Sequence, residues 1–158
     1  MDPVNEIRCA VEVRADAETR GRRLVGTLMR YGTAGVEGRE RFAPGALRWP
    51  DTGIVIDRQH NGRMPIMRVV PEVRGDSVVL DAPLPDTAAG RDAAREIRDG
   101  LFTGLSIEFR ALRQRYERGV RVVTDALLLG AGLVHNPSYA ASTAELRSRG
   151  SRRRNLYL

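Results

Sequence analysis

The sequence predicts a mainly β fold with helices (α+β), arranged as a barrel or folded sheet with one main helix at about residues 86–99. Short runs of alternating apolar and polar residues recur along the chain, separated by turn signals such as the Asn-Gly pair at residues 61–62. Such runs are typical of half-buried strands. One stretch has clear helical spacing, because Ala89, Ala93 and Ile97 lie four residues apart. They share one face of a helix that we expect to cover an opening of the sheet.

Turn and cap residues set the expected boundaries of these elements. Asp86-Thr87 is typical of a helix N-cap, and Gly100 is placed to end the helix. Pro44 and Gly45 mark a turn that opens a single helical turn, one of the short helical turns expected to flank the sheet. The expected strands cover residues 7–13, 23–31, 54–60, 63–70, 77–83, 102–109, 120–129, 130–134 and 145–149.

Length and charge limit the number of domains and the kinds of partner that can be expected. The 158 residues suit one domain, expected at residues 1–149, followed by a flexible basic tail at residues 150–158. The net charge is +6 and all 26 basic residues are arginine, a pattern that we attribute to coding bias. A basic chain attracts nucleic acid or acidic protein surfaces. Since Tyr157 is the only aromatic residue near the tail, nucleic acid is not expected as a partner.

Several common chemistries are excluded by the sequence. One cysteine rules out an internal disulfide and a cysteine-based metal site. With two histidines and no HExxH spacing, no catalytic zinc site is expected. The Gly-Ala-Gly run at residues 130–132 lacks the features of a phosphate-binding loop. We therefore expect no metal and no cofactor. No apolar run reaches membrane-spanning length and the N-terminal residues lack the pattern of a signal peptide, so a membrane is not expected as a partner.

A serine and a histidine at strand positions suggest hydrolytic chemistry. In the strand 102–109, Leu105 and Ile107 alternate with Ser106, which places the Ser106 hydroxyl on the opposite, accessible face. His60 comes at the end of the strand 54–60. A serine hydroxyl becomes a good nucleophile when a nearby base takes its proton. Histidine suits that role because its unperturbed pKa is about 6.5.

Five motifs in this order and spacing resemble the tailed-phage prohead (capsid maturation) serine protease family, which is related in fold to the herpesvirus assembly proteases. The resemblance spans residues 5–149. It implies a herpesvirus-protease-like β-barrel, with Ser106 as nucleophile and His60 as general base. The motifs are Phe42-Ala-Pro-Gly-Ala-Leu47, His60, Asp86-Thr87 with Gly90, Gly100-Leu-Phe-Thr-Gly-Leu-Ser-Ile-Glu-Phe109 and Leu133-Val-His-Asn-Pro-Ser-Tyr139.

The resemblance also implies a substrate, partners and a place of action. The protein would be a serine endopeptidase that cleaves scaffolding segments of phage capsid proteins during prohead maturation. Its partners would be the major capsid protein with its scaffolding segment, with the portal as a further candidate, and self-association is expected. It would act in the host cytoplasm, inside the assembling prohead. The alternative is a catalytically inactive protein of the same fold that acts as a capsid-assembly or scaffolding component.

The third member of the catalytic site is where the sequence departs from the family. The acidic residue that the family commonly carries on a later strand is replaced here by the glycines of residues 130–132. Asp125 is favoured over His135 as the group that orients His60, because an anion stabilises an imidazolium more strongly than a neutral imidazole does. Asp57 and Glu108 are further alternatives, as is a dyad assisted by backbone or water.

Overall fold

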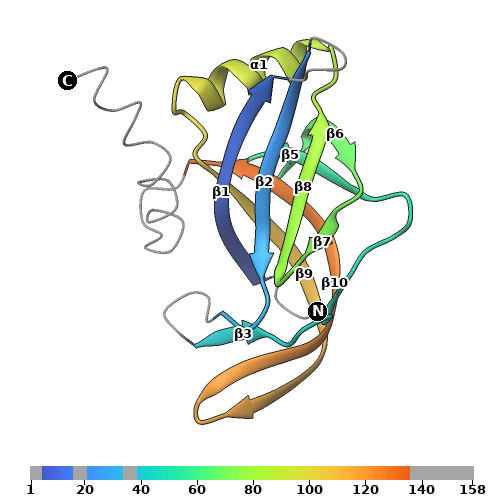
Figure 1. The fold of residues 1–158 in the computed structure, drawn as a ribbon, viewed down its shortest axis with the longest axis vertical. Coiled ribbons are helices and arrows are strands. Elements are labelled where there is room, and N and C mark those ends of the chain that lie inside the picture. The colour runs from blue at the N-terminus through green and yellow to red at the C-terminus, as the bar shows by residue number, and fades with distance from the viewer. Residues whose placement is uncertain (1–4, 16–20, 34–38, 136–158) are drawn as a thin grey trace, which may run out of the picture.

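One curved sheet of ten strands and one helix make up the part of the chain that the computed structural model describes, namely residues 5–15, 21–33 and 39–135 (Figure 1). This confirms the expected mainly β fold with one main helix. The elements are β1 (Asn5–Ala15), β2 (Arg22–Arg30), β3 (Glu40–Phe42), β4 (Leu47–Arg48), β5 (Ile54–Arg58), β6 (Asn61–Val69), β7 (Glu72–Arg74), β8 (Ser77–Pro83), α1 (Ala88–Arg98), β9 (Gly104–Glu117) and β10 (Val120–Val134).

The strand order places β10 at the centre of the fold. Hydrogen-bonded neighbours follow the path β6-β5-β10-β9-β1-β2-β8-β7, and β3 and β4 also pair with β10. β3, β4 and β5 run parallel to β10 one after another, whereas β9 runs antiparallel to it along almost its whole length. Figure 1 shows β1, β2 and β8 in front of β9 and β10. The sheet therefore curves so that its two halves face each other.

Side chains from both halves fill the space between them. Leu24 and Leu28 from β2 are fully buried, as is Leu80 from β8, as the period-two alternation of these strands predicts. Phe42 and Phe109 meet edge to face, with ring centroids 4.7 Å apart. Each such side chain contributes about 1.5–3 kcal/mol by leaving water, so this core accounts for much of the stability of the fold.

Helix α1 begins and ends where the sequence predicts. The Thr87 hydroxyl accepts a hydrogen bond from the Gly90 backbone N–H at 3.1 Å, which caps the first turn. A side chain at Gly90 would put its Cβ 2.1 Å from the Pro85 carbonyl oxygen, so glycine is required there. Gly100, just past the end of the helix, has a φ of +79°, a conformation that glycine adopts without strain. The helix buries Ile97 and packs against β1 and β6.

Three local predictions are wrong. β9 does not end at residue 109 but continues through the Arg-rich segment to Glu117, and β10 is one strand rather than two. The two strands pair from Val134↔Gly104 to Val120↔Glu117, so cross-strand hydrogen bonds stabilise a segment that has no apolar alternation of its own. Pro44-Gly45 forms a turn that leads into β4, not a helical turn. Among the described residues, α1 is the only helix.

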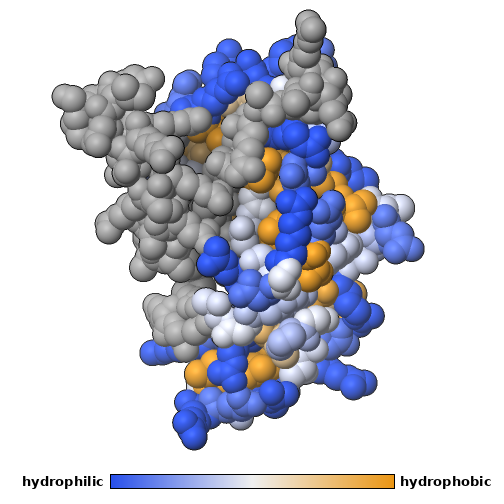
Figure 2. Space-filling view, in the orientation of Figure 1, coloured by the Kyte–Doolittle hydropathy of each residue, from blue (hydrophilic) through white to orange (hydrophobic). Residues whose placement is uncertain are grey.

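The paired strands extend beyond the core as a hairpin arm, by which we mean residues 110–125. Figure 1 shows this arm projecting past β3. Its side chains include exposed Leu112 and Tyr116. On the face shown in Figure 2, separate hydrophobic spots lie among hydrophilic residues, the ordinary pattern of a globular surface.

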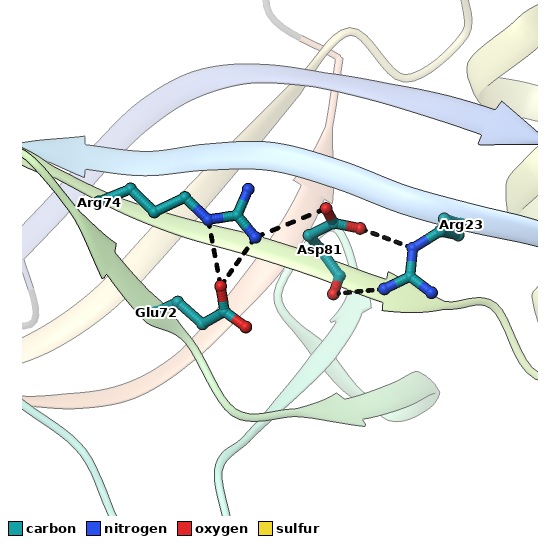
Figure 3. A network of polar contacts seen from close by, with 4 residues as sticks. All are labelled: Arg23, Glu72, Arg74 and Asp81. Carbon is teal, nitrogen blue, oxygen red and sulfur yellow. Dashed lines mark hydrogen bonds and ion pairs between the residues drawn. The ribbon is translucent and has the colours of Figure 1, made fainter. Parts of the chain in front are cut away.

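Four charged side chains link the neighbouring strands β2, β8 and β7 (Figure 3). Arg23 on β2 donates to Asp81 on β8, with its Nε 2.7 Å from Oδ1. Arg74 on β7 pairs with Glu72 at 2.8 Å and reaches Asp81 at 3.6 Å. The hydrogen bond to Glu72 is the main reason that the pKa of Arg74 is raised, and the negative charge of Glu72 raises it further. Exposed pairs of this kind contribute little to stability because water screens them, so the network fixes strand positions more than it stabilises the fold.

Some predictions fall outside the described residues. These are the short strand at residues 145–149, the basic tail at residues 150–158, and with them the domain boundary at residue 149. Within the described ranges, α1 is the only helix, and it is neither long nor apolar enough to span a membrane.

Candidate active site

Ser106 lies in the half of β9 that is buried on both faces. Leu105, Ser106 and Ile107 all have an exposed fraction of 0%. The expectation that Ser106 would be accessible is therefore wrong, because the sequence alternation identified one covered face and gave no sign of the second. A rigid, fully packed strand fixes the position of the Ser106 side chain, which is a requirement for a nucleophile.

His60 lies in a tight turn and not at a strand end. Arg58 of β5 pairs with Asn61 of β6, and the two residues between them, Gln59 and His60, have φ angles of 54° and 58°. Two left-handed residues in a two-residue loop define a hairpin turn of type I′. The Asn-Gly pair predicted to form the turn begins β6 instead. The Gln59 backbone N–H donates to the Leu133 carbonyl at 2.9 Å, so a long-range contact with β10 sets the position of the turn.

The backbone conformation at His60 is an unfavourable one for a residue with a side chain. Left-handed non-glycine residues cost about 1–2 kcal/mol each, and such conformations cluster at functional sites. The ion pair between Arg58 and Glu96 holds this turn against α1, and the Arg58 guanidinium also lies 5.5 Å from the ring centroid of Phe102. These two contacts of Arg58, which directly precedes the turn, help to offset its strain.

Gly132 is the point at which the serine and the histidine meet. It is the register partner of Ser106 on β9 and of Asp57 on β5. A Cβ at Gly132 would lie 2.9 Å from the His60 backbone nitrogen, 3.1 Å from its Nδ1 and 3.2 Å from Asp57 Oδ1. Because directly opposed residues of antiparallel strands point to the same face, the His60 ring lies on the Ser106 face of the sheet. The glycine supplies no side chain, as the sequence indicates, and it provides the space that the imidazole occupies.

Two carboxylates lie beside the imidazole. Glu108 follows Ser106 by two residues and so shares its face of β9, and Glu108 Oε1 is 2.5 Å from His60 Nδ1. The side chains of His60 and Glu108 are 22% and 34% exposed. Burial raises the pKa of Asp57, and the charge of Glu108 raises it further. The charge of His60 and a hydrogen bond from the His60 backbone N–H act in the opposite direction.

The two residues favoured as the third member lie elsewhere. Asp125 receives two hydrogen bonds from Arg48, at 2.8 and 3.0 Å. It precedes Gly132 by seven residues on β10, about 23 Å along an extended strand. His135 is exposed beyond the end of β10, with its Nδ1 3.1 Å from the Leu101 carbonyl oxygen. Glu108 and Asp57, the further alternatives of the sequence analysis, are the two that lie beside His60. The position of Glu108 two residues after Ser106 is the sequence signal that identifies it.

Within the residues that the structure describes, no group of three or more His, Cys, Asp or Glu side chains is arranged to hold a metal ion. The functional groups that the structure places at this site are a hydroxyl, an imidazole and two carboxyl groups. A buried serine next to an imidazole that itself contacts a carboxylate has the composition of a serine hydrolase site.

Comparison with known proteins confirms the resemblance found in the sequence. The family model described as caudovirus prohead serine protease matches residues 10–155. One similar solved structure is the capsid assembly protease of bacteriophage T4, gp21, with 12% sequence identity and a TM-score of 0.56 over 86% of this chain and 100% of that chain. At this identity the likeness shows a shared fold. No curated protein sequence matches the chain. The family match covers most of the chain, so the protein belongs to the caudovirus prohead serine proteases, a family of peptidases involved in capsid maturation.

Proposed function

We propose that this protein is the serine endopeptidase that cleaves scaffolding segments of phage capsid proteins inside the assembling prohead, in the host cytoplasm. Ser106 is the nucleophile and His60 the general base. The observation that carries these assignments is the meeting of the two residues across Gly132, where the imidazole of His60 lies within 3.1 Å of the Cβ position opposite Ser106. The major capsid protein and its scaffolding segment are the partners, with the portal as a further candidate, and copies of the protease self-associate.

The proposed chemistry is acyl transfer in two steps. The Ser106 hydroxyl attacks the carbonyl carbon of the scissile peptide bond while His60 takes the hydroxyl proton. The C–N bond then breaks, and the leaving amine receives that proton from His60. Water next attacks the ester on Ser106, and His60 again takes a proton and returns it to the serine oxygen. With Nδ1 facing Glu108, Nε2 is the nitrogen that exchanges protons with Ser106 and the substrate.

Access of the substrate to the nucleophile requires movement. Ser106 has no solvent-exposed surface, so a peptide carbonyl reaches its hydroxyl only after the covering side chains move apart. Binding energy from the rest of the substrate can drive such an opening, as it drives the conformational changes of enzymes that work by induced fit. The family's action inside a closed shell suits an enzyme that has little activity before it meets its substrate.

Co-expression with the cognate capsid protein tests this proposal. The wild-type chain should yield shortened capsid subunits, whereas Ser106→Ala should leave them at full length while keeping its thermal unfolding midpoint. Ser77→Ala is the matched control, since Ser77 begins β8 and its hydroxyl contacts only Asp76 at 3.3 Å among the contacts recorded for it. Processing by Ser106→Ala at the wild-type rate would remove Ser106 from the mechanism.

A second function is favoured by one observation, the complete burial of Ser106. In that case the chain would be an inactive member of the family that acts in capsid assembly as a scaffolding component. The same co-expression distinguishes the two. An inactive assembly component would leave capsid proteins uncut with both the wild-type chain and Ser106→Ala, and shells would still fail to form without it.

A further inference from the structure

We propose that Glu108 is the residue that positions His60, and that the third member of the site therefore lies on the nucleophile's own strand. This inference rests on the proposed function. It replaces the expected contribution of Asp125 or His135 with a carboxylate that the pleat of β9 places two residues beyond Ser106.

The contact between Glu108 and His60 is the first observation in its favour. Glu108 Oε1 lies 2.5 Å from His60 Nδ1, the nitrogen that faces away from the serine in a functional triad. Ser106 and Glu108 project from the same face of β9 about 7 Å apart, and the His60 ring fills the space over Gly132 beside them. One strand thus sets the spacing of nucleophile and anion, and the turn at Gln59-His60 brings the base between them.

The other carboxyl beside the turn has different surroundings. Asp57 lies on β5 just before the turn. Burial is the main reason that the pKa of Asp57 is raised, and Glu108 adds to it, whereas the backbone N–H of His60 lowers it. Because Asp57 is disfavoured as an anion, it is less suited to stabilise an imidazolium.

Several other charged side chains near this turn and along β9 and β10 are paired with one another. At the turn, Arg58 is paired with Glu96 of α1. In the hairpin arm, Asp125 is paired with Arg48 and Glu117 with Arg115 and Arg41. The contact recorded for Glu108 is instead with an imidazole. Glu108 from β9 and Asp57 from β5 are the carboxyl groups recorded beside His60.

The expected size of the effect follows from the role. An anion on the far nitrogen keeps the imidazole in the tautomer that accepts the serine proton, and its replacement by an amide in a serine protease lowers the rate by about 10⁴. Glutamine at residue 108 keeps the size of the side chain and removes its charge. Aspartate keeps the charge on a side chain shorter by one methylene, so it should restore part of the rate.

A fluorophosphonate probe measures the reactivity of Ser106 without a known substrate. Its phosphorus forms a bond to the serine oxygen, the phosphorus–fluorine bond breaks, fluoride leaves, and His60 takes the hydroxyl proton. Labelling of the purified full chain at several pH values, followed by mass spectrometry, gives a rate profile for each variant.

We expect Ser106 in Glu108→Gln to be labelled about 10²–10⁴ times more slowly than in wild type. Glu108→Asp should fall between the two, and Asp125→Asn, the matched control, should stay within about twofold of wild type because its charge lies along the strand from the site.

The pH profile separates positioning from mere structural support. Loss of the anion should move the midpoint of the profile to lower pH, since an imidazolium without its partner loses its proton more readily. Equal rates and equal midpoints for wild type and Glu108→Gln would overturn the assignment of Glu108 while Ser106 labelling itself still supported the proposed function. Because Ser106 is covered in the free chain, labelling is also run with the capsid protein added to open the site. A wild-type chain that forms no Ser106 adduct under either condition would overturn the proposed function and this inference with it.

A second measurement covers the case in which Glu108→Gln does not fold. The chain has two histidines, so in a His135→Ala background every imidazole signal in a nitrogen-15 spectrum belongs to His60. With Glu108 present, we expect a slowly exchanging Nδ1–H proton at low field. A ring protonated at Nε2 in the neutral form, with no such signal, would overturn the assignment.

Discussion

The two ends of the β9–β10 pair have the same secondary structure and opposite surroundings. At the site end, which comprises residues 104–109 of β9 and 128–134 of β10, Leu105 and Leu133 are fully buried. In the hairpin arm, Leu112 is 46% exposed and Tyr116 is 68% exposed. The strands pair in both regions, so the difference lies in what covers them.

Carboxyl groups in the two regions respond to these surroundings in opposite ways. In the arm, the hydrogen bond from Arg115 is the main reason that the pKa of Glu117 is lowered. Beside the site end, on β5, burial raises the pKa of Asp57. Glu108 there contacts an imidazole, whereas Asp125 in the arm contacts a guanidinium. A guanidinium beside a carboxylate stays protonated and only neutralises its charge. An imidazole beside a carboxylate can also exchange a proton with a third group. The comparison indicates that the local partner of each acidic residue decides which of them is placed to exchange a proton.

The largest effect is expected at the base of the proposed mechanism. His60→Ala should lower the rate of capsid-protein cleavage about as much as Ser106→Ala does, which in a well-studied serine protease is about 10⁶-fold. The double variant should be little slower than either single variant, because the pair acts as a unit. Rates measured on all three variants at matched expression provide the test. Losses that add up independently would mean that His60 does not deprotonate Ser106.

A smaller effect is expected from filling the space over the sheet at the site. Gly132→Ala places a methyl group 2.9 Å from the His60 backbone nitrogen, so the turn must shift, and displacement of a catalytic group by about 1 Å can cost about 10²-fold in rate. Gly130→Ala is the control on the same strand, where the nearest atom, the Val55 carbonyl oxygen, lies 3.3 Å away. That variant should lose less than about tenfold. Equal rates for the two alanine variants would show that the position of the turn over Gly132 is not critical.

The effect of Asp57 should appear in stability as a function of pH. Its pKa is higher in the folded protein than its ordinary value of 3.8, so the folded state binds the proton more readily than the unfolded chain. Below pH 3.8 the carboxyl carries no penalty, and as pH rises through its raised pKa the wild type loses stability. Asp57→Asn should therefore gain stability relative to wild type as pH increases from 4 to 7. Urea unfolding at several pH values measures this, and a difference that stays constant or reverses would contradict the raised pKa.

The smallest effect is expected in the arm. Arg48→Ala removes the ion-pair partner of Asp125. The Arg48 side chain is 58% exposed and the Asp125 side chain is 28% exposed. Pairs at this exposure contribute about 0.2–1 kcal/mol, so the free energy of unfolding should fall by no more than about 1 kcal/mol and the cleavage rate should not change. Chemical unfolding and the co-expression assay measure the two quantities. A loss of cleavage with intact folding would move the chemistry toward the arm.

Local sequence signals predicted the elements that depend on local chemistry. Thr87 and Gly100 mark the ends of α1 because capping and left-handed backbone are properties of those residues. Alternation located β2, β8 and the site half of β9. Ser106 and His60 were selected from sequence motifs, and the structure brings them together across Gly132.

Long-range contacts decided what the sequence did not predict. The turn at Gln59-His60 depends on a hydrogen bond to Leu133, and the favoured Asp125 is paired with Arg48, which lies 77 residues away in the chain. The Arg-rich segment became a strand because β10 pairs with it. Neither an ion-pair partner nor a second covered face can be read from one segment alone.

The most direct test of this account is the ratio of two cleavage rates. Glu108→Gln and Asp125→Asn make the same chemical change on paired strands, one at the site end and one in the hairpin arm. Both variants are co-expressed with the capsid protein, and the shortened subunits are quantified by mass spectrometry over time. We expect Glu108→Gln to process the capsid protein at least about 10² times more slowly than Asp125→Asn, which should match wild type. A slow Asp125→Asn with an unaffected Glu108→Gln would contradict the assignment of the catalytic carboxylate to the site end.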